Sequence, residues 1–497
     1  MHLFATHLSG KYPLKKCPPS GALSQQELPL NPDSSPSTDI GPELSSRSPT
    51  AGPTRAWWLL VKMTTFVIVL IVLLCFPRHQ AVVRYHVLVQ RPRITGTRPY
   101  LTGFVNSADA YARAARMVVL SVCGMHHTQQ ETKHEALKFN WTIEDPDGKH
   151  GKTWEFVTNK CVLEWQAPVE KRYVMRVQSW RGSNPSQVVG SGSSEFTVRD
   201  VWMAVIGDSF AAGQGNPDAR LQMFGIVQAE WIDGACARSS RSFAYRVYEQ
   251  IQAQHPDTGV LFTYLPCSGA TIRHGLIGSG QPAGAPDAHQ AQLTQLAYIA
   301  QAANGTRAAP DVLIMTIGGN DIGYSDVLMA LVWNEMKHLL KVMPRRLLAL
   351  ERQLAKLAVR IHQWLPDLVT RNIMLVEYYD FARNHKGQVD GNCPDLHGIA
   401  QSNLELTDSR VTVTLNQALQ RHALTHNWTY VSGVYNAFSR HGICAGPKQS
   451  YVLSPANSLM RQGNIFGAFH PNERGHAAVA DVVLPYVQRT LALVTDL

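Results

Sequence analysis

The chain has 497 residues, of which 45% are hydrophobic and 17% charged, and a formal net charge of +9 at pH 7. This length allows two or three domains with a large core, and the composition is that of an ordinary globular protein, which excludes a chain disordered throughout. Adjacent basic residues occur only at Lys15-Lys16, Lys171-Arg172 and Arg345-Arg346. Such scattered charge favours a solvated basic surface over a nucleic-acid site, with an anionic envelope surface as a weak alternative partner.

The N-terminal part of the chain has two different compositions. Residues 1–56 are rich in Pro, Ser, Thr and Gly without an apolar period, which predicts a disordered tail. Residues 57–76 are almost wholly apolar and about long enough to span a bilayer. We expect a transmembrane signal anchor; alternatively Met63 is the true start and 63–76 is the core of a signal peptide. The protein is then either membrane-anchored, with its catalytic domain outside the cytoplasm, or secreted.

Residues 81–199 have a β-rich pattern. Clusters of β-forming residues such as 138–143 and 173–177 are separated by turn signals such as Asp145-Pro146-Asp147-Gly148. This pattern predicts a small β-sandwich domain and loosely resembles immunoglobulin-like or PKD-like modules.

Six cysteines follow the apolar segment, and they fall in pairs along the chain. An even set of this kind favours disulfides between successive cysteines in an oxidising compartment. No Cys-x-x-Cys spacing occurs, so we expect no metal site. The expected pairs are Cys123–Cys161, Cys236–Cys267 and Cys393–Cys444.

The first candidate catalytic motif follows the apolar run 201–206. Gly207-Asp208-Ser209-Phe210 comes directly after this run. A buried strand that ends in a Gly-x-Ser turn delivers a serine to the carboxyl edge of a sheet, where open α/β sheets bind their ligands. Ser209 is therefore the candidate nucleophile.

Two further motifs follow strand-like runs and could stabilise an oxyanion. Cys267-Ser268-Gly269 follows 260–264, and Gly269 would let backbone N–H groups approach a substrate oxygen. Gly318-Gly319-Asn320-Asp321 follows 312–317, and the amide of Asn320 can donate hydrogen bonds to an oxyanion.

The fourth motif supplies a base. Phe469-His470-Pro471-Asn472 precedes the apolar helical run 477–487, and Pro471 and Asn472 are residues that begin helices. His470 would thus stand at the start of a helix near the C-terminus of the chain.

Ser209, Gly269, Asn320 and His470, each at a strand-to-loop junction and in this order, resemble the SGNH hydrolases, also called the GDSL esterase/lipase family. The likeness covers about 201–497 and is closest to secreted, disulfide-bonded members. It implies a flavodoxin-like α/β/α sandwich of three layers for 200–497, with Ser209 as nucleophile, His470 as base, and Ser209, Gly269 and Asn320 forming the oxyanion hole. The alternation of predicted strands and helices after Val201 agrees with a parallel sheet covered on both faces.

One position departs from the family pattern. The family usually carries Asp three residues before its histidine, where this chain has Gly467. No Asp or Glu occurs between Asp408 and Glu473. A backbone carbonyl near Gly467–Ala468 could orient the imidazole instead, and a distant acid such as Glu377 is the alternative.

We therefore expect a serine esterase that acts on carboxylic esters, such as an acyl lipid, an acetylated glycan or a small ester. It would need no cofactor, function as a monomer and contact the membrane through 57–76. The alternative is a catalytically inactive, membrane-tethered protein that binds a glycan or another polymer.

Overall fold

The computed structural model describes residues 82–91, 105–123, 137–148, 152–223, 226–278, 291–302 and 309–492. No helix within these ranges is long and apolar enough to cross a membrane. The expected tail 1–56 and the apolar segment 57–76 lie outside the described residues. Residues 80–497 form one compact unit, which contains all of the described residues.

Two sheets form the β-rich part of the unit. The larger sheet has the strand order β1-β8-β7-β4-β5, and the smaller sheet has the order β2-β3-β6. All strand pairs are antiparallel except β1 with β8. The strands are β1 (Val83–Arg84), β2 (Leu88–Gln90), β3 (Met117–Ser121), β4 (Leu137–Glu144), β5 (Thr153–Thr158), β6 (Val162–Gln166), β7 (Arg172–Arg181) and β8 (Val188–Thr197).

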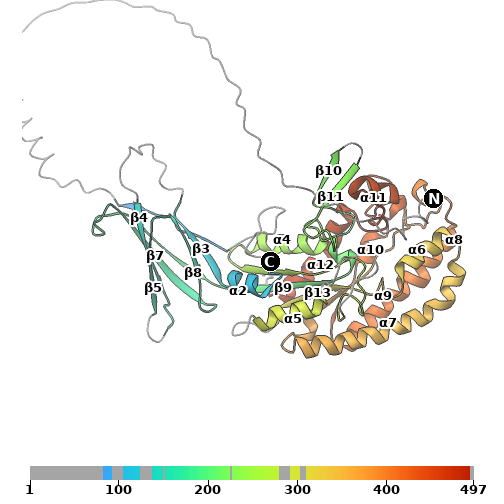
Figure 1. The fold of residues 1–497 in the computed structure, drawn as a ribbon, viewed down its shortest axis with the longest axis horizontal. Helices are drawn as coiled ribbons and strands as arrows, with labels where there is room; N and C mark the ends of the chain where they lie inside the picture. The colour runs from blue at the N-terminus through green and yellow to red at the C-terminus, as the bar shows by residue number, and fades with distance from the viewer. Residues whose placement is uncertain are drawn as a thin grey trace, which may run out of the picture. The chain divides into compact units, whose positions relative to one another are not determined.

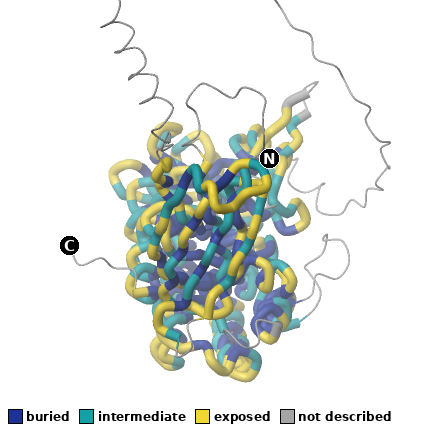
Figure 2. The backbone as a smooth tube through the Cα atoms, turned by 90° about the vertical axis from the view of Figure 1, so that its left-hand side faces the viewer, coloured by how far each residue is buried: buried dark blue, intermediate teal, exposed yellow. Residues whose placement is uncertain are grey.

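Alternation along these strands builds a separate hydrophobic core. Buried and more exposed residues alternate along β4 and β7, as a sheet with one buried face requires, and Figure 2 shows the same mixture of burial classes. Trp141, Tyr173 and Met175 have no exposed surface and form the centre of this core. A disulfide joins Cys123 to Cys161 beside it.

The helix α2 (Ala108–Ala114) lies between β2 and β3 in the sequence but packs against the second core of the unit. Tyr111 contacts Trp202 with ring centroids 4.9 Å apart. Asp200 is buried, forms an ion pair with Arg91 and accepts a hydrogen bond from the backbone N–H of Arg116 at 2.6 Å. Asp200 begins the first strand of a third sheet, which is described next and is called the catalytic sheet below. Buried polar contacts therefore tie the β-rich part to this sheet.

The catalytic sheet is entirely parallel and has the order β12-β9-β13-β14-β15. Its central strands are buried on both faces, which explains their uninterrupted apolar sequences. The strands are β9 (Asp200–Gly207), β12 (Gly259–Tyr264), β13 (Val312–Thr316), β14 (Ile373–Val376) and β15 (Thr429–Val431), and a separate hairpin consists of β10 (Ala219–Met223) and β11 (Ile226–Glu230).

Helices cover both faces of this sheet. Figure 1 shows α4 and α12 on one face and α5 and α7 on the other, so the mixed α/β fold expected from the sequence is confirmed. The helices are α3 (Ser209–Ala212), α4 (Phe243–Gln254), α5 (Gln292–Ala302), α6 (Tyr324–Val332), α7 (Met336–Trp364), α8 (Gln401–Thr407), α9 (Val413–Thr425), α10 (Val434–Phe438), α11 (Pro455–Gln462) and α12 (Glu473–Thr490).

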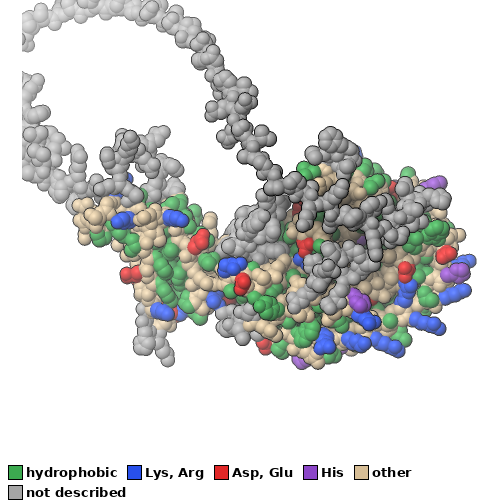
Figure 3. Space-filling model, viewed as in Figure 1, with side chains coloured by type: hydrophobic (Ala, Val, Ile, Leu, Met, Phe, Trp, Pro, Cys, Tyr) green, Lys and Arg blue, Asp and Glu red, His purple; other side chains and the backbone are tan. Residues whose placement is uncertain are grey.

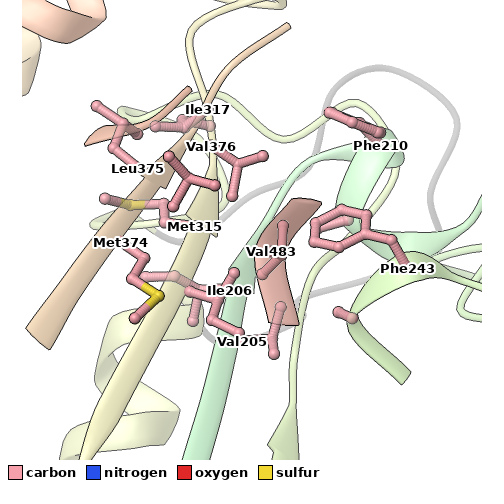
Figure 4. Packing of buried hydrophobic residues seen from close by; sticks show 14 of the residues in the cluster. Val205, Ile206, Phe210, Phe243, Met315, Ile317, Met374, Leu375, Val376 and Val483 are labelled. Atoms are coloured by element: carbon pink, nitrogen blue, oxygen red, sulfur yellow. The ribbon is translucent and has the colours of Figure 1, made fainter. Parts of the chain in front are cut away.

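The main core extends to the segment that follows β9. Phe210 of α3 packs against Phe243 of α4 with ring centroids 5.2 Å apart, on the side of the sheet that carries Val483 of α12 (Figure 4). Because Phe210 is buried, the residue before it has a fixed position.

The basic residues are less scattered in the fold than along the chain. Figure 3 shows Lys and Arg side chains gathered over α7. Residues four apart share one face of a helix, so a row of charge can form without adjacent basic residues in the sequence. The exposed members of this row are Lys337, Lys341, Arg345, Arg352, Lys356 and Arg360.

Candidate active site

Ser209 emerges from the centre of the catalytic sheet. Strand β9 lies between β12 and β13, ends at Gly207 and is followed by a turn that brings Ser209 to the first position of α3. Gly207 has a φ of 144°, and a Cβ atom on it would lie 2.5 Å from the carbonyl oxygen of Thr316. Only glycine fits this turn, which explains why the motif begins with it.

Buried side chains from distant segments hold the turn in place. The carboxylate of Asp208 accepts hydrogen bonds from Thr316 Oγ1 at 2.7 Å and from the hydroxyl of Tyr378. Burial raises the pKa of Asp208 above its ordinary value. The Gln292 side chain accepts from the N–H of Gly207 at 2.7 Å and donates to its carbonyl at 2.9 Å. Asp208 thus supports the turn, and its carboxylate bonds to Thr316 and Tyr378.

His470 lies in the loop between α11 and α12 and faces the serine. Its Nε2 atom lies 2.8 Å from Ser209 Oγ, and its Nδ1 atom lies 3.1 Å from the carbonyl oxygen of Ala468. A carbonyl oxygen can only accept a hydrogen bond, so Nδ1 carries the proton in this contact. The lone pair of Nε2 is then directed at the hydroxyl of Ser209, as a general base requires.

The loop that carries His470 is fixed by its backbone. Phe469 has a φ of 64°, which is unusual for a residue with a Cβ atom. Its N–H donates to the carbonyl of Leu453 at 2.8 Å, and its carbonyl accepts from the hydroxyl of Tyr379 at 2.9 Å. A Cβ atom on Gly467 would lie 2.8 Å from the Cα of Gly215. The position where the family usually has Asp therefore has no room for a side chain.

Glu377, the acid considered as a distant orienting group, and Glu473, the first acid after His470, are engaged elsewhere. Glu377 accepts from the backbone N–H groups of Gly433 at 2.8 Å and Tyr435 at 2.9 Å, at the start of α10. Glu473 forms an ion pair with Arg246 at 3.2 Å. In the part of the chain that the structure describes, the hydrogen-bond partners of the His470 ring are Ser209 and a backbone carbonyl, with no carboxylate among them.

The two candidate oxyanion motifs are in contact with each other. Gly269 has a φ of 76°, which glycine adopts without strain. The Asn320 side chain donates through Nδ2 to the carbonyl of Ala270 at 3.0 Å. An amide nitrogen carries two hydrogens, so one remains for a substrate oxygen. Among the described residues, no hydrogen-bond acceptor is assigned to the backbone N–H of Ser209 or of Gly269.

A disulfide and a buried acid brace these loops. Cys236 and Cys267 are joined, and the N–H of Cys267 donates to the carbonyl of Gly207 at 3.0 Å. Asp321 accepts from the N–H of Ile272 at 3.0 Å, which links the loop after β13 to the loop after β12. Burial raises the pKa of Asp321 to about 7. The loops after β9, β12 and β13 are thus held together at one edge of the sheet.

Burial sets the charge of the two histidines near the site. It lowers the pKa of His470 to about 4, against a small opposing effect of the carbonyls of Ala468 and Gly467. The ring is therefore neutral near pH 7 and able to accept a proton. Burial also lowers the pKa of His476 to about 3, and its Nδ1 accepts from the N–H of Phe243 at 3.1 Å. His476 is a structural residue of the core.

Some residues of the site could not be found from the sequence. Gln292, Tyr378 and Tyr379 lack a motif and become neighbours of the serine or the histidine loop only through the fold. The third disulfide, Cys393–Cys444, joins two loops that follow β14 and α10. In the described ranges, no group of three or more His, Cys, Asp or Glu side chains could hold a metal ion.

Comparisons with known proteins show the family of this chain. The sequence model of the GDSL-like Lipase/Acylhydrolase family matches residues 205–478, which is more than half of the chain. The protein belongs to the GDSL-like lipase/acylhydrolase family and is an ester hydrolase. None of the curated proteins compared with the chain matches it.

Solved structures with similarity to this chain include a phospholipase, a lipase and an esterase. Phospholipase A1 from Streptomyces albidoflavus is 18% identical, with 58% of this chain and 99% of that chain covered at a TM-score of 0.39. An extracellular lipase from Streptomyces rimosus is 20% identical, with the same coverage and TM-score. A catalytic mutant of an acetylxylan esterase from Geobacillus stearothermophilus is 18% identical, with 58% and 95% covered at a TM-score of 0.30.

Proposed function

We propose that this ester hydrolase acts by acyl transfer through Ser209, with His470 as general base. The observation that carries the proposal is the 2.8 Å contact between His470 Nε2 and Ser209 Oγ in a site where the ring is neutral. A serine hydroxyl is a weak nucleophile until an adjacent base removes its proton. The contact supplies such a base within hydrogen-bond reach.

The proposed reaction has two stages. Ser209 Oγ attacks the ester carbonyl while its proton passes to His470 Nε2, and the tetrahedral intermediate then expels the alcohol, which takes that proton from His470. A water molecule next attacks the acyl-enzyme and gives a proton to His470. When the second intermediate collapses, the carboxylic acid leaves and the proton returns to Ser209.

In this proposal, the carbonyl of Ala468 takes the role of the carboxylate of a catalytic triad. It accepts the Nδ1 proton at 3.1 Å, which fixes the tautomer and the direction of the ring. A carbonyl carries no full charge, so it stabilises the imidazolium less than a carboxylate would. We propose that Ser209 and His470 work as a pair whose third partner is the backbone.

The oxyanion of each intermediate would be held by three donors. These are the backbone N–H groups of Ser209 and Gly269 and the free hydrogen of the Asn320 amide. Donors fixed in place before the reaction need no reorganisation, and removal of one such donor typically costs about a hundred- to a thousandfold in rate. The contacts that join the loops after β12 and β13 support this assignment.

The disulfides bear on the compartment of the protein. Three disulfides suit an oxidising compartment outside the cytoplasm. We propose an extracytoplasmic, monomeric enzyme that acts on acyl lipids, acylated glycans or small esters. Anchoring through 57–76 and the division of the chain into 81–199 and 200–497 remain part of this proposal.

A covalent probe tests the nucleophile. A fluorophosphonate should label the purified protein and should fail to label the Ser209→Ala variant. Ser432→Ala is the matched control, because Ser432 is an exposed serine that follows β15 at the same edge of the sheet. Labelling of Ser209→Ala at the wild-type level would overturn the assignment. Absence of p-nitrophenyl acetate hydrolysis by the unlabelled wild-type protein would favour the alternative of an inactive binding protein.

A further inference from the structure

A cavity of about 300 Å³ lies beside the histidine loop and is lined by three arginines. Arg220 comes from β10, Arg241 from the segment before α4, and Arg461 from α11. The remaining lining residues are Asn216, Pro217 and Ala219. Three guanidinium groups from three separate segments thus converge on one concave site.

The cavity is structurally close to the catalytic pair. The side chain of Asn216 donates to the carbonyl of Pro471 at 2.7 Å, and Pro471 directly follows His470. A Cβ atom on Gly215 would lie 3.6 Å from the Cβ of His470. The segment that leads from α3 to the cavity therefore runs along the histidine loop.

Positive charge at the cavity is only partly compensated. Glu473 lies 3.9 Å from Arg241 and 3.2 Å from Arg246, so one carboxylate serves two arginines. In the described part of the chain, the guanidinium groups of Arg220 and Arg461 have neither a hydrogen bond nor an ion pair, although their backbones belong to β10 and α11. Burial and the neighbouring arginines lower the pKa of Arg461, with Glu473 acting in the opposite direction.

The acid that precedes the lining residue Ala219 in the sequence has hydrogen-bond partners of its own. Asp218 is not among the lining residues, and it accepts hydrogen bonds from the hydroxyls of Ser239 at 3.2 Å and Ser240 at 2.6 Å. Unpaired guanidinium groups in a concave site are arranged to bind an anion, and planar guanidinium forks match phosphate oxygens in particular. Among the described residues, Glu473 is the one acid that forms an ion pair with a lining arginine.

Exposed apolar residues neighbour two of the arginines in the sequence. Leu221 follows Arg220, and Leu459 and Met460 precede Arg461; all three are exposed. The hairpin β10–β11 packs against α11, as Figure 1 shows, so these residues belong to neighbouring elements. The two elements therefore expose both apolar and cationic side chains.

We propose that the cavity lined by Arg220, Arg241 and Arg461 is an anion subsite that binds the phosphate group of an acyl ester substrate. This inference rests on the proposed esterase function. The phosphate could belong to a soluble phosphorylated ester or to a lipid headgroup. In both cases the subsite holds the anion while Ser209 reacts with the ester.

The test compares two soluble esters that differ only in a phosphate group, dibutyryl-glycerol and dibutyryl-glycerol phosphate. Wild-type protein should favour the phosphate ester in kcat/KM by about tenfold or more, the scale of one hydrogen bond to a charged group. Arg461→Gln and Arg241→Gln should each reduce this preference several-fold through KM. Hydrolysis of the neutral ester should change little. Arg360→Gln at the far end of α7 is the matched control and should keep the preference.

Each result decides between the two proposals. Hydrolysis of both esters without a preference for phosphate, or with a preference that the arginine variants retain, would overturn the subsite alone. If neither ester is hydrolysed, the proposed function fails. The subsite is then judged by calorimetric titration with inorganic phosphate, which should bind wild type and Arg360→Gln more tightly than Arg461→Gln; equal or absent binding would overturn it.

The source of the phosphate is resolved with vesicles. Phosphatidylcholine vesicles with added phosphatidylglycerol should retain wild-type protein more than Arg461→Gln if the ligand is a lipid headgroup. Equal retention of the two proteins, together with a preference for the soluble phosphate ester, assigns the subsite to soluble esters.

Discussion

The Nδ1 atom of His470 lies 3.1 Å from the carbonyl oxygen of Ala468, two residues earlier in the same loop. This short-range contact stands where the family usually has a carboxylate. The positive φ of Phe469, 64°, turns the chain between the two residues so that the carbonyl faces the ring. The orientation of the base is thus built into the loop that carries it.

If the backbone orients His470, single acids should be dispensable. We expect Glu377→Gln and Asp481→Asn to keep most of the wild-type kcat on a neutral ester, while His470→Ala abolishes it. In a triad with a carboxylate, loss of the acid costs about ten-thousandfold because the imidazole takes the wrong tautomer. Steady-state kinetics on p-nitrophenyl acetate provide the measurement, and a loss of about a thousandfold in either acid variant would refute the backbone assignment.

Restoring the usual family residue should harm this enzyme. A Cβ atom on Gly467 would lie 2.8 Å from Gly215 Cα and 2.9 Å from Ser458 Oγ, and the first neighbour is backbone that cannot move freely. We expect Gly467→Asp to displace the loop, lower the melting temperature and remove most activity. Ala456→Asp adds the same carboxylate at an exposed position of α11 and is the control. Full activity of Gly467→Asp would show that the loop can open without loss of the catalytic contact.

The disulfide Cys236–Cys267 should matter for both stability and catalysis. It braces the loop that carries Gly269, and removal of a native disulfide typically costs about 2–5 kcal/mol. The double variant Cys236→Ala/Cys267→Ala should lose unfolding free energy and also kcat at temperatures where it remains folded. The variant Cys123→Ser/Cys161→Ser should lose stability with little change in kcat, since that bridge lies beside the core of the β-rich part. Denaturant unfolding and kinetics together distinguish the two, and equal kcat losses would contradict the proposed brace.

The pH dependence of the reaction should reflect the lowered pKa of His470, which is partly buried. Protonation of His470 removes the base, so kcat/KM falls as the pH decreases through its pKa. Because burial lowers this pKa to about 4, activity on a neutral ester should persist well below the range of an ordinary histidine. Initial rates after brief incubation, with folding checked at each pH, give the profile. A midpoint near the ordinary value of about 6.5 would mean that the ring is more solvated than the structure indicates.

His476 should make the fold sensitive to acid. Its pKa is lowered to about 3 in the folded protein, whereas in the unfolded chain it titrates near the ordinary value of about 6.5. The unfolded state therefore takes up the proton first, so stability from this group is complete above about pH 6.5 and declines as the pH falls towards about 3. His476→Gln should lower stability near neutral pH but show a shallower decline between about pH 7 and about pH 4. Identical slopes in denaturant unfolding would exclude this contribution.

The sequence alone determined the family, the strand that delivers Ser209, and the order of the motifs that surround it. These features depend on local patterns, because an uninterrupted apolar run before a Gly-x-Ser turn is typical of a buried parallel strand. The helical spacing of residues 347–364 likewise predicts a helix, and the structure confirms it. The helix α7 nevertheless begins at Met336 and continues through Pro344, and its buried residues pack into the main core with neighbouring helices.

Only the tertiary structure decided how the site is held together. The hydrogen bonds from Gln292 and Tyr378 to the serine turn join segments separated by more than eighty residues, and no local pattern reports such contacts. Packing also leaves no room for a side chain at Gly467. It likewise brings three arginines from separate segments to one cavity, namely Arg220, Arg241 and Arg461. Periodicity and turn chemistry act over a few residues, whereas the partner of a buried polar group is chosen by the whole fold.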